Sequence, residues 1–383
     1  MKSTKPRTAS SLGMFDLFKG LGIATVVFVH TAELYALNTS GGISISTFLI
    51  FIYREALMSA FYIASGYGFR ERSIGKCIHQ QLKGVLPPYL YAVAATAVIH
   101  LAFHYACFGI WENSVAETGK VLGGMLLGLP HTAEYFGITF FSCGPMWYLL
   151  AMAVGWIILD ILMNTFPERY IPYAVVFTMV LGWATCLVWE LPFCLSQGMT
   201  VVPYLYIGYL AKKRHWFDQP LSFKFKGLVL LCALLAAGGA LATQSTDNMS
   251  MGEWTLGPVG ILCNGVIGFW AVHWFVGLSR KCEGSLAHTL ENVGRRSLQI
   301  FCVHTVELTA VPWYLFAAQF AATPLLGLLL HFALRCWLIL IVCLFLVNRR
   351  RIFRLRPRRS ARTAPTATAT TTAPFTRYAS RHG

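Results

Sequence analysis

The stretch Leu17–Leu37 reads LFKGLGIATVVFVHTAELYAL and decides the class of fold. The hydrocarbon core of a bilayer needs about 20 mainly apolar residues in a helix, and this stretch is long enough to cross it. It is too long and too polar at its ends for a removable signal peptide, and it lacks a small-residue cleavage site. The sequence therefore predicts a membrane-spanning helix near the N-terminus.

The rest of the 383-residue chain repeats this pattern. It is 56% hydrophobic and 12% charged, with a mean hydropathy of +0.57, whereas soluble domains are about 45–50% apolar and 25% charged. This composition excludes a soluble globular protein. We predict an all-α polytopic membrane protein of about ten transmembrane helices. The predicted spans are Leu17–Leu37, Ile45–Phe69, Val85–Cys107, Pro145–Thr165, Tyr170–Trp189, Cys194–Ala211, Gly227–Thr243, Trp254–Leu278, Ser297–Phe320 and Pro324–Val347.

The positions of the basic residues predict the orientation. The chain has 31 Lys and Arg against 16 Asp and Glu, a net charge of +15. With a cytoplasmic N-terminus, all basic residues except Arg54, Lys120 and Arg335 fall in the termini or in loops on the cytoplasmic side. The positive-inside rule therefore predicts two cytoplasmic termini, in a multi-pass protein of the cell (inner) membrane. Because the charge is clustered between apolar runs, nucleic acid is not expected as a partner.

Three regions are predicted along the chain. Residues 1–14 form a cytoplasmic N-terminal segment, 15–348 the membrane domain, and 349–383 a basic, disordered cytoplasmic tail that contacts lipid headgroups. Within the membrane domain, the stretch 108–144 is broken by Gly and Pro and is expected to be a re-entrant or interfacial piece on the outer side.

The eleven cysteines show no CxxC spacing, and no three potential ligands have a recognisable metal-site spacing, so no metal is expected. Two pairs flank outer loops, Cys107 with Cys143 and Cys186 with Cys194. In an oxidising compartment these pairs are the candidates for disulfides.

Ionisable side chains inside predicted spans are functional candidates, because a charge in the bilayer costs several kcal/mol unless it is paired or hydrated. They are His30 and Glu33 in the first span, Arg54 and Glu55 in the second, His304 and Glu307 in the ninth, and His331 and Arg335 in the tenth. His100, His104 and His273 are expected to make interhelical or interfacial contacts.

Two of these candidates are His-x-x-Glu pairs, His30 with Glu33 and His304 with Glu307. The spacing places both members of a pair on one helix face. A carboxylate beside an imidazole fixes its tautomer and raises its basicity, as a general base requires. Each histidine is either an interhelical hydrogen-bonding residue or part of a catalytic site. Arg54 and Arg335 either form buried ion pairs or bind substrate.

Three sequence motifs, in this order, resemble those of the acyltransferase-3 family of membrane acyltransferases. They are Asp16–Gly20 (DLFKG) followed by His30, Phe61–Tyr67 (FYIASGY) followed by Leu86–Tyr89 (LPPY), and Pro145–Leu149 (PMWYL) together with Gly294–Leu298 (GRRSL) and His304. The resemblance covers about residues 14 to 347. The chain departs from the family at His79–Lys83 (HQQLK), where members often carry paired arginines.

The resemblance implies transfer of an acyl group, usually acetyl from acetyl-CoA, across the membrane to a hydroxyl of a surface glycan or glycolipid. Acyl-CoA is then a co-substrate, no cofactor is bound, and membrane lipid surrounds the protein. His30 is implied as the catalytic residue, either as a base or as an acyl carrier, with Glu33 and His304 beside it. We expect Lys19, Arg70, Arg72 and Lys83 to bind the donor phosphates. Arg54, Glu55, Trp147, Glu307 and Arg335 are the candidates for substrate binding.

A multi-pass transporter of a small anion or sugar is the alternative, because the same buried polar groups would line a permeation path. Transporters commonly contain two internal repeats with matching broken helices. Residues 1–190 and 191–347 show no convincing similarity to each other. The lack of detectable similarity between the two halves favours an enzyme over a transporter.

Overall fold

The computed structural model describes residues 12–35, 45–282 and 284–352. The predicted N-terminal segment 1–14 and basic tail 349–383 therefore lie largely outside the described residues. The chain divides into two compact units, Met1–Cys343 and Leu344–Gly383, and the site lies within the first.

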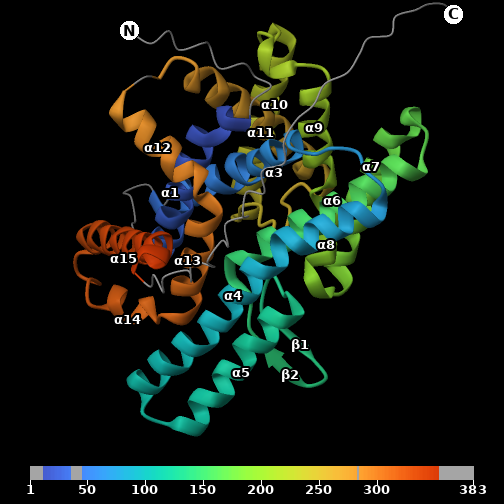
Figure 1. Ribbon diagram of the computed structural model, residues 1–383. Helices are drawn as coiled ribbons and strands as arrows, with labels where there is room; N and C mark the ends of the chain where they lie inside the picture. The colour runs from blue at the N-terminus through green and yellow to red at the C-terminus, as the bar shows by residue number, and fades with distance from the viewer. Residues whose placement is uncertain (1–11, 36–44, 283, 353–383) are drawn as a thin grey trace, which may run out of the picture. The chain divides into compact units, whose positions relative to one another are not determined.

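The described residues are mainly helical, with one two-stranded antiparallel sheet (Figure 1). The first half contains η1 (Leu12–Phe15), α1 (Asp16–Ala32), α2 (Ile45–Ile52), the π-helical turn η2 (Tyr53–Leu57), α3 (Met58–Tyr67), α4 (Ile74–Phe108), α5 (Trp111–Leu127), β1 (Ala133–Tyr135), β2 (Ile138–Phe140), η3 (Gly144–Met146), α6 (Trp147–Thr165), η4 (Glu168–Tyr170) and α7 (Ile171–Val188). The second half contains η5 (Pro192–Cys194), α8 (Leu195–Thr200), α9 (Val202–Lys213), η6 (Trp216–Asp218), α10 (Phe223–Thr243), α11 (Pro258–Ser279), α12 (Ser285–Arg295), α13 (Ser297–Ala310), α14 (Trp313–Ala318) and α15 (Pro324–Ile352).

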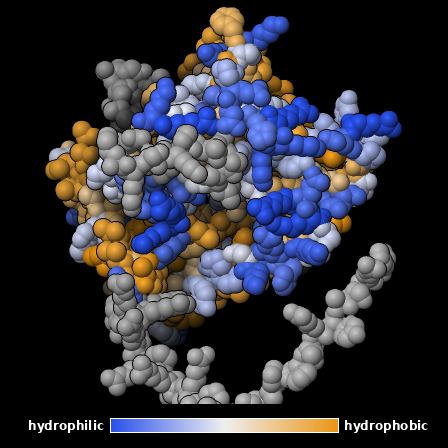
Figure 2. Space-filling model, turned by 45° about the horizontal axis from the view of Figure 1, so that its top comes forward, coloured by the Kyte–Doolittle hydropathy of each residue, from blue (hydrophilic) through white to orange (hydrophobic). Residues whose placement is uncertain are grey.

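Seven helices in the described part of the chain are long and apolar enough to cross a membrane: α1, α4, α6, α7, α10, α11 and α15. The protein is thus a helical, multi-pass membrane protein. Figure 2 presents the top of Figure 1 and shows hydrophilic side chains gathered on that face, with hydrophobic side chains along its left flank.

The other three predicted spans are interrupted helices. The second is divided by the π-helical turn η2, the sixth bends at Val201 between α8 and α9, and the ninth breaks before Pro312 between α13 and α14. Proline has no backbone N–H with which to continue a helix, which explains the last break. The count of ten crossings and the cytoplasmic termini stay predictions.

The helix α4 is longer than predicted. It begins at Ile74 rather than Val85 and runs through Pro87 and Pro88 for 35 residues, about 52 Å at 1.5 Å per residue. Its far half forms a hairpin with α5, next to β1 and β2 (Figure 1). His100 and His104 join these two helices through Thr118 and Ser114, at 2.8 Å each, so the interhelical prediction for both is confirmed.

Glycines allow two pairs of helices to approach closely around the site. A Cβ atom on Gly20 of α1 would lie 2.0 Å from the carbonyl oxygen of Leu290 in α12, and one on Gly66 of α3 would lie 2.2 Å from that of Leu205 in α9. The facing residues Gly294 and Gly208 are equally close to the backbone of the partner helix. Any side chain at these crossings would force the helices apart.

Candidate active site

A cavity of about 620 Å³ follows one face of α1. The lining residues of this segment recur at spacings of three and four: Phe15, Lys19, Ile23, Val26, His30 and Glu33. From Lys19 to Glu33 this face extends about 21 Å, a large part of the bilayer core. The cavity therefore connects the level of Lys19 with the level of His30.

The other walls come from four parts of the chain. The segment η2–α3 contributes Tyr53, Arg54, Met58, Phe61, Ala64, Ser65 and Gly68, and the segment η3–α6 contributes Pro145, Trp147, Tyr148, Leu149, Met152 and Trp156. The loop before α11 and α11 itself contribute Asp247, Asn248, Met249, Ser250, Trp254 and Asn264. The helix α13 contributes Ser297, Leu298 and Phe301. The middle is mainly apolar, and the polar groups gather towards the two ends. This layout suits a long apolar chain with polar groups at both ends.

His30 and Glu33 form a pair in the wall of the cavity. Nδ1 of His30 lies 3.0 Å from Oε2 of Glu33, and Nη2 of Arg54 lies 3.8 Å from the other carboxylate oxygen. Arg54 also donates a hydrogen bond of 2.9 Å to Thr246. Because Nδ1 faces the carboxylate, Nε2 of His30 remains for a reacting group.

The π-helical turn places neighbouring residues in different environments. Arg54 faces the cavity, whereas Glu55 is buried and accepts a hydrogen bond of 3.3 Å from the backbone N–H of Asp247. Glu55 thus contacts the backbone of the loop before α11 rather than the cavity.

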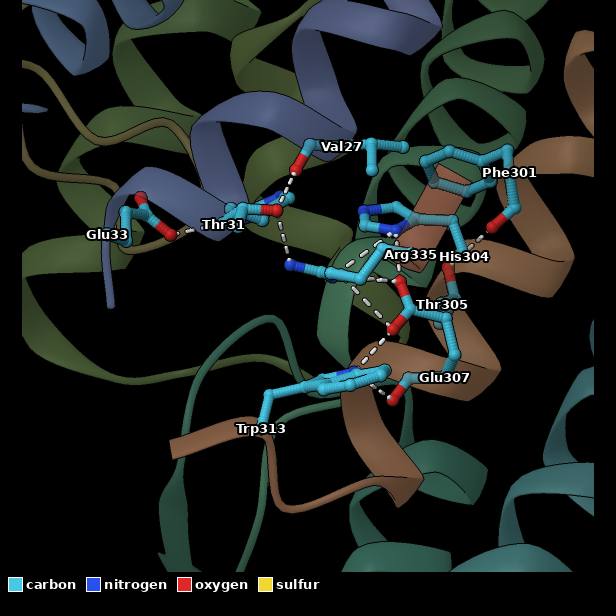
Figure 3. Close-up of polar contacts among 10 residues, drawn as sticks. Val27, Thr31, Glu33, Phe301, His304, Thr305, Glu307, Trp313 and Arg335 are labelled. Carbon is cyan, nitrogen blue, oxygen red and sulfur yellow. Dashed lines mark hydrogen bonds and ion pairs between the residues drawn. The ribbon is translucent and has the colours of Figure 1, made fainter. Parts of the chain in front are cut away.

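His304 and Glu307 form a second pair immediately behind the first. Their Nδ1 and Oε1 atoms are 2.8 Å apart, and the His304 ring lies 5.6 Å from the His30 ring. Arg335 donates to both oxygens of Glu307 and, over 2.9 Å, to Thr31 (Figure 3). His304 and Arg335 are fully buried, and neither lines the cavity. The ion-pair interpretation of Arg335 is therefore what the geometry supports.

A family model of the acyltransferase domain matches residues 13–348. The chain belongs to the acyltransferase-3 family. This membrane acyltransferase has no match among the curated proteins or among the solved structures that were searched.

The loop before α11 is the part of the candidate site that sequence reasoning missed. Asp247 organises it, accepting hydrogen bonds from the backbone N–H of Thr255 (2.7 Å), the Thr255 hydroxyl (2.8 Å) and the Asn264 amide (3.2 Å). Burial raises the pKa of Asp247. An Asp and a Thr eight residues apart in a polar loop match no motif considered in the sequence analysis, so this contact has no signal in the sequence.

The predicted donor-binding cations are not brought together. Lys19 lines the cavity and pairs with Asp16 at 2.8 Å, whereas Arg70 lines a separate pocket. The side chain of Arg72 donates to Gln80, and Lys83 is exposed on α4. Trp147, a candidate for substrate binding, lines the cavity. The catalytic and binding roles of these residues stay predictions.

All eleven cysteines are free thiols, and neither predicted disulfide is formed. Instead the buried thiol of Cys194 contacts that of Cys143, which joins one member of each predicted pair. No group of three metal ligands occurs among the described residues.

Proposed function

We propose that this protein is an O-acyltransferase of the inner membrane that moves an acyl group, in particular acetyl, from acyl-CoA to a hydroxyl of a cell-surface or lipid-linked carbohydrate. The observation that carries the proposal is the single cavity along α1, with Lys19 at one end and the His30–Glu33 pair near the other. The donor enters on the predicted cytoplasmic side and the acceptor meets it on the outer side.

The apolar middle of the cavity suits the pantetheine arm and the acyl chain. Ile23, Val26, Phe61, Ala64 and Met152 form this section. The diphosphate of the donor stays at the Lys19 end, because it is too costly to desolvate among apolar side chains. The thioester then lies beside His30.

The chemistry assigns His30 as the general base. Nε2 takes the proton of the acceptor hydroxyl while its oxygen attacks the thioester carbonyl. The tetrahedral intermediate collapses, the C–S bond breaks, and the CoA thiolate takes the proton from His30. Glu33 stabilises the imidazolium in between, as the carboxylate does in other His–carboxylate pairs. His304, which is held by Glu307, lies on the side of the His30 ring away from the cavity and positions that ring.

The polar outer end suits a carbohydrate. Asn248, Ser250 and Trp254 line it together with Arg54. Asn248 and Ser250 offer hydrogen-bonding groups to sugar hydroxyls, and the indole ring of Trp254 offers a stacking surface.

The test uses purified full-length protein in vesicles with labelled acetyl-CoA and a glycolipid extract. Label should move to a glycolipid in wild type. In Ala64→Phe the transfer should fall at least about tenfold, because the ring fills the cavity. Ala102→Phe is the matched control, since Ala102 is exposed on α4. Uptake of a solute without release of CoA would instead indicate a transporter, and equal activities of the two variants would contradict the assigned donor path.

A further inference from the structure

A second pocket, of about 470 Å³, lies between the end of α3 and the end of α9, which the sequence places on the cytoplasmic side. Its walls are Tyr67, Phe69, Arg70, Glu71, Tyr209, Lys212, Lys213 and His215. The pocket is distinct from the cavity along α1, although Tyr67 lines one and its neighbour Gly68 lines the other.

The charges in this pocket are unevenly paired. Lys213 binds Glu168 at 2.8 Å, and Glu71 accepts a hydrogen bond from the Tyr209 hydroxyl. Arg70 and Lys212 have no acidic partner among the described residues. Burial and the nearby Arg70 guanidinium both lower the pKa of Lys212. Two cations thus line one pocket without forming an ion pair to an acidic side chain of the described residues, and Glu71 in the same pocket is bound by Tyr209.

Aromatic rings fix the wall beside these cations. Phe69 meets the Tyr209 ring edge-on at 5.9 Å, and Tyr209 stacks on Tyr206 at 6.3 Å. Phe69 is almost fully buried and packs against Trp156 on its other side. The wall is therefore preorganised, with an apolar surface next to a cationic one.

We propose that this pocket binds a phosphate ester, whose oxygens are held by Arg70 and Lys212 while its organic part packs on Tyr209. A guanidinium matches the geometry of phosphate, and an ammonium adds a point charge. Two kinds of molecule carry such an ester: an anionic membrane lipid, in its headgroup, and the acyl-CoA, at its nucleotide end. The second source rests on the proposed function.

The test measures binding directly, so its result does not depend on acyl transfer. Native mass spectrometry of the full-length protein in detergent is titrated with phosphatidylglycerol and, separately, with adenosine 3′,5′-bisphosphate. Diacylglycerol and adenosine are the phosphate-free controls. We expect one equivalent of a phosphate ligand to bind, and the double variant Arg70→Gln/Lys212→Gln to weaken its affinity at least about tenfold.

The matched control is Lys224→Gln/Lys226→Gln, which removes the same charge from exposed positions on α10. It should change the affinity less than about twofold, since isolated surface charges contribute little. Saturable binding of the lipid alone identifies a headgroup site, and binding of the bisphosphate alone identifies a nucleotide site. The proposal is overturned if neither phosphate ligand binds saturably, or if both double variants weaken binding equally.

Discussion

His30 and His304 have the same His-x-x-Glu partner arrangement but different surroundings. The His30 side chain is 22% exposed and lines the cavity, whereas His304 is fully buried. Arg335 also binds Glu307, so the second pair belongs to a buried network of protein side chains. An imidazole that exchanges protons with substrate must be reachable, which is why the proposed mechanism uses His30 for the transfer and His304 for positioning.

Replacing His30 by Ala should therefore reduce acyl transfer at least about 10²-fold, because the general base is lost. Glu33→Gln should reduce it about tenfold, since an amide does not stabilise the imidazolium. The measurement is the turnover of labelled acetyl-CoA, with the amount of protein in the membrane fraction as the control. Normal transfer by His30→Ala would refute the mechanism, and failure to accumulate in the membrane would show a structural role.

Glu190 is a titrating group in the short loop between α7 and η5. It is buried, its carboxylate lies 3.4 Å from His131, and its backbone carbonyl accepts a hydrogen bond from Tyr135. Burial raises the pKa of Glu190 to about 7, so the folded state keeps its proton over a pH range in which the unfolded state has lost it. Stability from this group is present below about pH 4.5 and is lost as the pH rises through about 7.

Glu190→Gln should accordingly be more stable than wild type by about 1–3 kcal/mol at pH 8 and about equal to it near pH 4.5. Thermal unfolding in detergent at several pH values measures the difference. Because His131 lies 3.4 Å from the Glu190 carboxylate, the same comparison is repeated in a His131→Gln background, where the imidazole cannot titrate. A stability difference that does not grow with pH would contradict the assignment.

At the scale of elements, one buried side chain, that of Arg335, joins three helices through an ion pair and a hydrogen bond. Arg335 of α15 binds Glu307 of α13 and Thr31 of α1. Removing one partner of a buried pair leaves the other charge uncompensated, whereas removing both is often nearly neutral.

Arg335→Met should thus destabilise the protein by about 3–5 kcal/mol, and Arg335→Met/Glu307→Leu should recover most of that loss. Arg280→Met is the control, because it breaks a partly exposed pair with Asp218 at 2.8 Å and should cost less than about 1 kcal/mol. Unfolding temperatures in detergent provide the comparison. A double variant no more stable than Arg335→Met would argue against a simple ion pair.

The family motifs gain a structural meaning at this scale. Gly20, Gly66 and Gly294 lie in the three motifs, and each stands where two helices nearly touch. Their role is close packing of α1 against α12 and of α3 against α9. The sequence shows that these glycines belong to the motifs. Only the packing shows which neighbouring helix lies against each glycine.

At the scale of the whole molecule, the proposed direction of acyl transfer requires a defined orientation of the protein in the membrane. Reporter fusions at Lys213 and Asp247 should lie on opposite sides, Lys213 in the cytoplasm and Asp247 outside, since α10 lies between them and the basic residues cluster near Lys213. Reporters on the same side at both positions would refute the predicted topology and the direction proposed for acyl transfer.

The sequence by itself determined the membrane class, the approximate spans and the two His-x-x-Glu pairs, because hydropathy and helical spacing are local properties. Tertiary structure decided that the His30–Glu33 pair, and not the His304–Glu307 pair, faces a cavity. It also decided that Glu55 contacts the Asp247 loop, and that Cys143 meets Cys194. These outcomes depend on contacts between residues about 50 to 300 positions apart. Such residues are brought together by the rotation and packing of helices, which no local sequence pattern encodes.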